Sequence, residues 1–113
     1  FTADGAAAAI SALLDSGRTF DAVFSNDEMA AGICRILLSR RIGIPSQMQV
    51  CGCDNLPLGK LLYPSLTTVS LDYDALAEQA MALIHGENRV RLPIKQRLPP
   101  ELVVRESTRP AHT

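Results

Sequence analysis

Tryptophan is absent from this sequence, and aromatic residues make up only 4% of it. Sites for single-stranded nucleic acid stack bases on such rings, so the composition argues against a surface of that kind. No apolar run approaches the roughly 18 residues of a membrane-spanning helix. A net charge of −1 gives no overall field that attracts nucleic acid or an anionic membrane. The 113 residues, 47% of them hydrophobic, are typical of one small globular domain at most.

Three cysteines are an odd number, which argues against a disulfide-built scaffold. Cys51 and Cys53 lie two apart in an expected strand, where same-face neighbours are about 6.6 Å apart along the strand. A disulfide needs Cβ atoms about 3.8 Å apart. No CxxC pair is present, and His85 and His112 are distant in sequence. We therefore expect small buried hydrophobes in a reducing cytoplasm, with no metal site and no cofactor.

Catalytic motifs are missing as well. The sequence contains neither a GxSxG nor a GxGxxG segment. Asp54 beside Cys53 is compatible with nucleophile chemistry, but a cysteine inside an apolar strand is usually inert. A basic stretch over residues 89–97 is typical of a solvated edge strand. We expect no catalytic residue and no enzyme activity.

Hydrophobic spacing predicts alternating helices and strands. Helices are expected over residues 3–16, 27–41 and 72–85, with Asp4, Asp27 and Asp72 as their N-caps. Strands are expected over 20–25, 49–53, 66–71, 92–98 and 102–105, the first of them buried, and residues 56–64 form an irregular or short helical crossing. Such alternation with short connections predicts an α/β fold whose sheet is at least partly parallel.

An amide or an acid follows each of two expected parallel strands. Asn26 comes after the first strand and Asp54 after the second. In open α/β sheets ligands bind beyond the carboxyl ends of strands, so both side chains should face one crevice. An amide and a carboxylate supply the donors and acceptors that a sugar requires. The alternative is that both are turn residues that bond local backbone.

An apolar cluster lies in the connection between the second and third expected strands. Leu58, Leu61, Leu62 and Tyr63 fall within six consecutive positions. Connections normally expose polar residues. This cluster is therefore either tucked into the core or part of a subunit interface.

Three segments resemble the LacI/GalR family of bacterial repressors. They are AVFSNDEMAAG at residues 22–32, IPSQMQVCGCDNLPLGKLLYPSLTTV at 44–69 and LPPELVVREST at 98–108. The family's forms are a strand that ends in ND, a strand that ends in GFDD, an LTTV segment and a closing LVVREST. Their order and spacing cover nearly the whole chain, and the resemblance is to the C-terminal part of the effector-binding core.

The resemblance implies a partial periplasmic-binding-protein-like (type I) domain with a mostly parallel sheet flanked by helices. Residues 1–71 would belong to the C-terminal subdomain, 72–91 to a helix of the other subdomain and its connection, and 92–113 to closing strands and a tail. Asn26 and Asp54 match positions that line the effector cleft, and Phe1 lies near the aromatic that stacks on the ligand. The implied homodimer interface comprises Ala31, Arg35, Leu38, Leu58, Leu61 and Leu62.

The family pattern is broken at several positions: Gln47 or a neighbour stands where the family has an acid after VP, and two residues of a later motif also differ. The GFDD motif reads Gly52-Cys53-Asp54-Asn55 here. Cys53 replaces a bulky aromatic, which leaves a roomier wall. Asn55 replaces the second acid, so the role of that charge does not carry over.

The resemblance implies a fragment of a cytoplasmic bacterial transcriptional regulator that responds to a small effector such as a sugar. The family's helix-turn-helix, hinge helix and N-terminal subdomain have no counterpart in these 113 residues. We therefore expect the chain alone to bind no operator DNA and to bind effector weakly or not at all. Three alternatives remain: a periplasmic sugar-binding protein of similar fold, a stand-alone dimerisation module, and an α/β enzyme that uses Asp54.

Overall fold

A computed structural model describes residues 1–86 and 97–110 of the chain. Along the chain lie α1 (Ala3–Asp15), β1 (Ala22–Phe24), α2 (Asp27–Ser39), β2 (Gln49–Cys53), α3 (Leu58–Leu61), β3 (Thr67–Ser70), α4 (Tyr73–Ile84) and β4 (Glu101–Val103). The sheet order is β1-β2-β3-β4. β1, β2 and β3 pair in parallel, and β4 pairs antiparallel with β3. The mostly parallel α/β sheet predicted from the sequence is confirmed.

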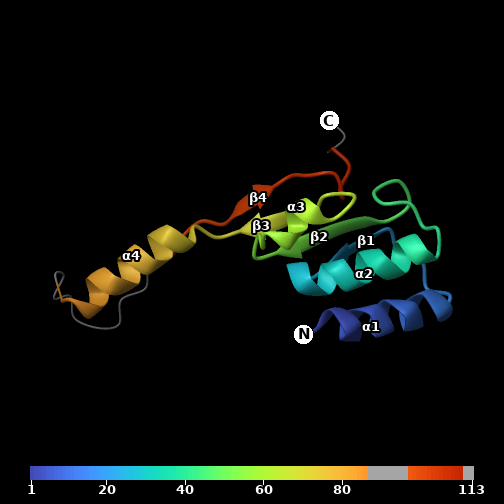
Figure 1. The fold of residues 1–113 in the computed structure, drawn as a ribbon, viewed down its shortest axis with the longest axis horizontal. Helices are drawn as coiled ribbons and strands as arrows, with labels where there is room; N and C mark the ends of the chain where they lie inside the picture. The colour runs from blue at the N-terminus through green and yellow to red at the C-terminus, as the bar shows by residue number, and fades with distance from the viewer. Residues whose placement is uncertain (87–96, 111–113) are drawn as a thin grey trace.

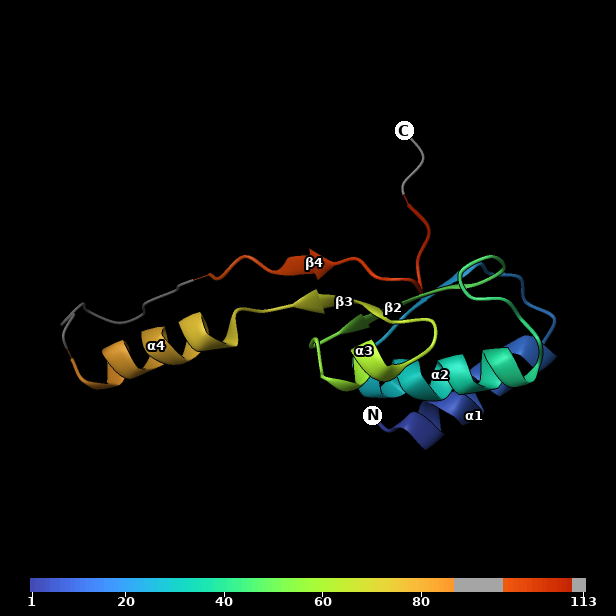
Figure 2. The ribbon, with the colours of Figure 1, turned by 45° about the horizontal axis from the view of Figure 1, so that its top comes forward.

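One face of the sheet carries the core (Figure 1, Figure 2). α2 lies against it, and α1 packs on the outer side of α2. Gly32 of α2 permits this close approach, because a Cβ at that position would overlap the carbonyl oxygen of Ala3. The buried apolar residues that form the core are Ala6, Ile10, Ala30, Ile33, Cys34, Leu37, Met48, Val50 and Leu66.

The opposite face of the sheet is open among the described residues. Phe24 is 66% exposed there, and it lines a shallow hollow with Gln49, Cys51 and Thr108. The prediction that residues 20–25 form a buried strand is therefore wrong in its burial. β1 is an edge strand, and the described helices that pack on the sheet lie on the other face.

Two of the three predicted N-cap residues differ from those in the structure. Thr2 caps α1 through a bond from the Gly5 amide to its Oγ1 (3.0 Å), and Asn26 caps α2 through a bond from the Met29 amide to its Oδ1 (2.8 Å). The caps predicted at Asp4 and Asp27 are wrong, because each of these residues already lies inside the helix. The cap predicted at Asp72 is confirmed.

The remaining predicted elements are displaced by a few residues or lie beyond the description. α2 ends at Ser39, two residues before the predicted end. The predicted crossing contains the short α3. The strand predicted over 92–98 falls mostly on residues 87–96, which lie outside the described ranges, and β4 covers Glu101–Val103 rather than 102–105.

α4 projects away from the sheet, as both ribbon views show (Figure 1, Figure 2). None of its residues is buried, and its apolar side chains Leu76, Met81 and Ile84 are exposed. Residues 71–72, which enter it from β3, and residues 98–100, which lead directly to β4, line one hollow. No described helix is both long and apolar enough to cross a membrane.

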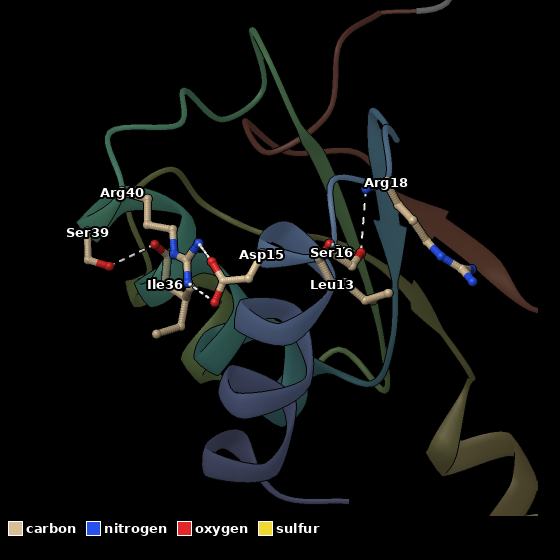
Figure 3. Close-up of polar contacts among 7 residues, drawn as sticks. All are labelled: Leu13, Asp15, Ser16, Arg18, Ile36, Ser39 and Arg40. Carbon is tan, nitrogen blue, oxygen red and sulfur yellow. Dashed lines mark hydrogen bonds and ion pairs between the residues drawn. The ribbon is translucent and has the colours of Figure 1, made fainter.

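An ion pair joins the C-terminal ends of α1 and α2 (Figure 3). Arg40 donates to both carboxylate oxygens of Asp15, at 2.8 and 3.4 Å. The hydrogen bond from Arg40, and then its charge, lower the pKa of Asp15 below its ordinary value of 3.8. Both side chains are exposed to solvent, so the ion pair contributes little to the stability of the contact between α1 and α2.

Asp15→Asn should lower the melting temperature at pH 7 by no more than about 4 °C, as expected of an exposed pair. The native carboxyl has the lower pKa, so its contribution is present above pH 3.8 and is lost as pH falls through the lowered value. Thermal unfolding at pH 7 and pH 2.5 measures this difference. A gap between variant and parent that persists at pH 2.5 would contradict the assignment.

Candidate ligand-binding site

The carboxyl ends of three parallel strands meet on one side of the molecule. Ser25, which follows β1, donates its amide to the carbonyl of Cys51 (3.1 Å), so Asn26 leaves the sheet beside β2. Asp54, which follows β2, donates its amide to the carbonyl of Val69 (2.9 Å). Asn26 and Asp54 therefore follow neighbouring strands at the same edge of the sheet, the one formed by the carboxyl ends of the parallel strands. The sequence pattern predicted this shared position.

Asn26 combines a structural role with an open donor. Its Oδ1 accepts the hydrogen bond that caps α2, so the local-backbone alternative considered for this residue is correct for that atom. Among the described residues its Nδ2 takes part in no hydrogen bond, and the side chain is half-buried. The cap fixes the side chain, so the Nδ2 donor has a fixed direction.

Asp54 lies in a backbone conformation that side chains rarely adopt. Its φ is 113° and that of Asn55 is 53°. Such residues cost of order 1–3 kcal/mol each and persist only where the surroundings hold them. Three successive amides of this turn are held. The amide of Asp54 bonds the carbonyl of Val69, that of Asn55 bonds Thr68 Oγ1 (3.2 Å), and that of Leu56 bonds Asp27 Oδ2 (2.7 Å).

Asp27 anchors this arrangement from inside the core. It has no solvent exposure. One carboxylate oxygen accepts from the Leu56 amide and the other from Thr68 Oγ1 (2.7 Å). Gly52 provides the space, because a Cβ there would overlap Asp27 Oδ1. Asp27 thus joins α2, β3 and the Asp54 turn.

The side chain of Asn55 ties the same turn to the closing segment. Its Oδ1 accepts from Arg105 Nη2 (2.8 Å), and its Nδ2 donates to Ser70 Oγ (3.3 Å). Arg105 Nη1 also donates to the carbonyl of Leu66 (2.8 Å). The amide therefore serves as both acceptor and donor between the two crossing segments, which a carboxylate at this position would not do.

Residues that follow β4 are fastened across β2 and β3. The buried Ser107 donates its Oγ to the Val50 carbonyl (2.6 Å) and accepts there from the Thr67 amide (2.8 Å). Thr108 Oγ1 lies 2.7 Å from Thr67 Oγ1. Residues of the closing REST motif (105–108) thus form hydrogen bonds that hold this segment against the sheet.

The cysteines carry no disulfide among the described residues. Burial raises the pKa of Cys34 to about 11. Desolvation, and then the charges of Asp54 and Asp27, raise the pKa of Cys53. A raised pKa keeps a thiol protonated and unreactive. Cys51 and Cys53 are half-buried rather than fully buried as predicted, because they face the open side of β2. In the described ranges no cluster of three His, Cys, Asp or Glu residues has the geometry of a metal site.

Phe1 lies apart from the other two predicted ligand residues. Its ring is fully exposed, and the described residues do not pack against it. α1 and α2 begin at the same end of the molecule (Figure 1), so Phe1 lies on the side where Asn26 lies. The structure thus brings Asn26 and Asp54 to one edge and leaves Phe1 at its periphery.

The residues predicted for a dimer interface lie on α2 and around α3. Leu61 is 85% exposed, and Arg35 and Leu38 are exposed on α2. Ala31, Leu58 and Leu62 are half-buried, and Leu62 packs against the core.

Sequence reasoning missed Asp27 and Tyr73 as parts of the site. Tyr73 donates its hydroxyl to the carbonyl of Asp54 (3.1 Å). The sequence pattern predicts a helix cap at Asp27, because its partner Thr68 is 41 positions away. An acid at a helix start and two successive threonines in β3 indicate a buried hydrogen bond only once the sheet order shows that they are neighbours.

Asp27→Ala should lower the free energy of unfolding by about 3 kcal/mol, because it leaves the Leu56 amide and the buried Thr68 hydroxyl without this acceptor. Glu28→Ala is the matched control, since this exposed acid lies in the same helical turn and should change stability by less than about 0.5 kcal/mol. Urea unfolding measures both. Equal effects would show that Asp27 does not anchor the turn.

Comparison with known proteins places this geometry in a family. Residues 2–108 match the family described as "Periplasmic binding protein-like domain". The chain is 38% identical over 112 residues to the ribose operon repressor of Halalkalibacterium halodurans, which covers 96% of this chain and 34% of that protein. It is 36% identical to the transcriptional regulator GalR of Escherichia coli, over 91% of this chain and 31% of that protein.

Solved structures agree with the sequence relatives. A LacI family transcriptional regulator from Arthrobacter sp. FB24, crystallised in complex with lactose, superposes with a TM-score of 0.84 and 36% identity. That match covers 96% of this chain and 42% of the other. The chain spans about a third of the length of the curated relatives. It belongs to the periplasmic binding protein-like domain family, in the form found in the effector domains of LacI/GalR-type regulators.

Proposed function

We propose that this chain is the effector-binding and dimerisation part of a bacterial transcription regulator that responds to a small sugar. The observation that carries the proposal is the edge where Asn26 and Asp54 leave neighbouring parallel strands. The named relatives support it, since they are operon repressors and regulators and one solved relative holds lactose. Such a regulator works in the cytoplasm, and its response makes and breaks no covalent bond.

Each predicted ligand residue has a defined task in this proposal. The Nδ2 of Asn26 donates to a sugar hydroxyl, and the carboxylate of Asp54 accepts from another. The ring of Phe1 covers an apolar face of the sugar. A site that bonds each hydroxyl rejects analogues that lack one, which is the basis of sugar selectivity.

The subdomain division predicted from the resemblance is part of the proposal. Residues 1–71 form one wall of the cleft, and 72–91 lead through α4 into the second subdomain. Residues 92–113 close the first. The exposed apolar side chains of α4 support this division, because a helix with such a face is stable when it packs on another element. An effector that binds one cleft closure more tightly shifts the population toward it, and with it the spacing of paired DNA-binding heads.

The complete product of the gene that encodes this chain provides the test. Calorimetry with D-ribose, D-galactose, sucrose and lactose tests effector binding, and fluorescence anisotropy with DNA from upstream of the gene tests operator binding. The proposal expects a dissociation constant in the micromolar to millimolar range for at least one sugar, and a sugar-dependent change in DNA affinity. Sugar binding without DNA binding would favour a transport-type binding protein. If the protein binds neither a sugar nor DNA, the stand-alone dimerisation module is the interpretation that remains.

Asp54→Ala in the complete gene product should weaken binding of the selected sugar by at least about 2 kcal/mol, the cost of losing a charged hydrogen-bond acceptor. Asp21→Ala is the matched control, because this exposed acid precedes β1 at the opposite end of the strands. Calorimetric titration of both variants decides the matter. An unchanged affinity in Asp54→Ala removes this residue from the site.

Leu61→Glu should weaken the proposed homodimer at least tenfold, about 1.4 kcal/mol, because it places a charge at an apolar interface anchor. The control is Leu13→Glu, which changes an exposed leucine on the outer helix α1. Sedimentation equilibrium measures both dissociation constants. A dimer that tolerates Leu61→Glu as well as Leu13→Glu excludes the segment around α3 from the interface.

A further inference from the structure

Tyr73 connects α4 to the edge where Asp54 lies. It is the first residue of α4, and its hydroxyl donates to the carbonyl oxygen of Asp54 at 3.1 Å. Among residues 1–86 and 97–110, no other hydrogen bond links a residue of α4 to the sheet or to α2. None of the residues of α4 is buried. The Tyr73 hydrogen bond is therefore the contact through which the position of α4 can affect Asp54.

The Tyr73 hydrogen bond holds the carbonyl end of the peptide group between Asp54 and Asn55. The carbonyl of Asp54 and the amide of Asn55 belong to the same planar unit. The carbonyl end accepts from Tyr73, and the amide end donates to Thr68 Oγ1 at 3.2 Å. Thr68 is in turn held by the buried Asp27. A rigid plane held at both ends does not pivot, whereas a plane held only at the amide end does.

Such a pivot changes which side-chain rotamers are open to Asp54. Rotation of this plane alters ψ of Asp54 and φ of Asn55, and the φ of Asn55 is 53°, in the left-handed region. Backbone in this region relaxes toward ordinary conformations once a restraint is removed. The rotation leaves the Cα–Cβ bond of Asp54 in place, but the rotamers open to a side chain depend on φ and ψ, so a changed ψ shifts the Asp54 carboxylate to another rotamer.

We propose that Tyr73 is a positioning residue for the ligand site, whose hydroxyl fixes the Asp54 peptide group and thereby aims the Asp54 carboxylate. This inference rests on the proposed function, since it assigns the carboxylate to ligand binding. Desolvation, and then the charges of Asp54, Cys53 and Asp27, raise the pKa of Tyr73, which agrees with its place beside these groups. The hydroxyl, and not the ring, is the group that acts.

The sequence offers a matched pair of variants, because Tyr63 and Tyr73 are its two tyrosines. Tyr73→Phe removes the hydroxyl and keeps the ring. Tyr63→Phe makes the same change at a side chain that is 85% exposed and whose hydroxyl, in the described structure, bonds no other group. Both variants are made in the complete gene product, and both should fold, because neither ring is removed.

The first readout needs no ligand. In Tyr73→Phe the backbone amide of Asn55 should exchange its hydrogen about fivefold faster by NMR, as expected for the loss of one hydrogen bond, and the Asp54 13Cγ resonance should move. Tyr63→Phe should leave both signals in place. A purely structural role of Tyr73 would leave the 13Cγ resonance unchanged. Unchanged signals in Tyr73→Phe overturn the inference whether or not any sugar binds.

The second readout is the calorimetric Kd for whichever of D-ribose, D-galactose, sucrose or lactose the parent binds. Tyr73→Phe should raise this Kd about fivefold, and Tyr63→Phe should leave it unchanged. An altered NMR signature with an unchanged Kd overturns the link between Tyr73 and ligand binding. If the parent binds none of the four sugars, the proposed sugar response fails, and the NMR readout still decides the positioning role.

Discussion

A carboxylate without access to water organises the edge of the sheet where the candidate site lies. Asp27 accepts one hydrogen bond from the Leu56 amide and another from the Thr68 hydroxyl. A buried carboxylate is costly unless it is fully hydrogen-bonded, so the three parts of the chain that supply these groups are held in one arrangement. The turn with two left-handed residues, Asp54 and Asn55, persists because this arrangement holds its amides. Without Asp27 the Leu56 amide would lose its acceptor, and Thr68, which holds the Asn55 amide, would lose its buried partner.

The closing segment depends on the same framework from the other side. Arg105 bonds the side chain of Asn55, and Ser107 crosses between β2 and β3. These residues are about 40 to 57 positions from their partners, so they become neighbours only when the sheet has formed. The network therefore links the strand ends, the crossing segments and the chain end, and α4 meets it at Tyr73. A ligand at this edge would contact a surface whose geometry is fixed before it arrives, which lowers the cost of binding.

Local pattern predicted the order of the elements and the parallel sheet, because apolar spacing and short connections determine both. It predicted that Asn26 and Asp54 lie at one edge for the same reason. It assigned the cap of α2 to the wrong member of the Asn26–Asp27 pair, since both residue types cap helices and the burial of Asp27 depends on the distant Thr68. It also expected a buried first strand, but Phe24 lies on the open face of the sheet. The role of Tyr73 was invisible, because its local sequence shows only the beginning of a helix. Phe1, Ala31, Arg35 and Leu38 were suggested by the family resemblance, whereas the apolar cluster of the connection had already suggested Leu58, Leu61 and Leu62. All of these assignments stay predictions.

The central claim is that the edge held by Asp27 presents Asn26 and Asp54 to one sugar. The most direct measurement is a crystal structure of the complete gene product grown with the sugar that calorimetry selects. The account predicts sugar hydroxyls within hydrogen-bond distance of the Nδ2 of Asn26 and of the carboxylate of Asp54, with the Asp27 bonds intact. A bound sugar that contacts neither residue would contradict it.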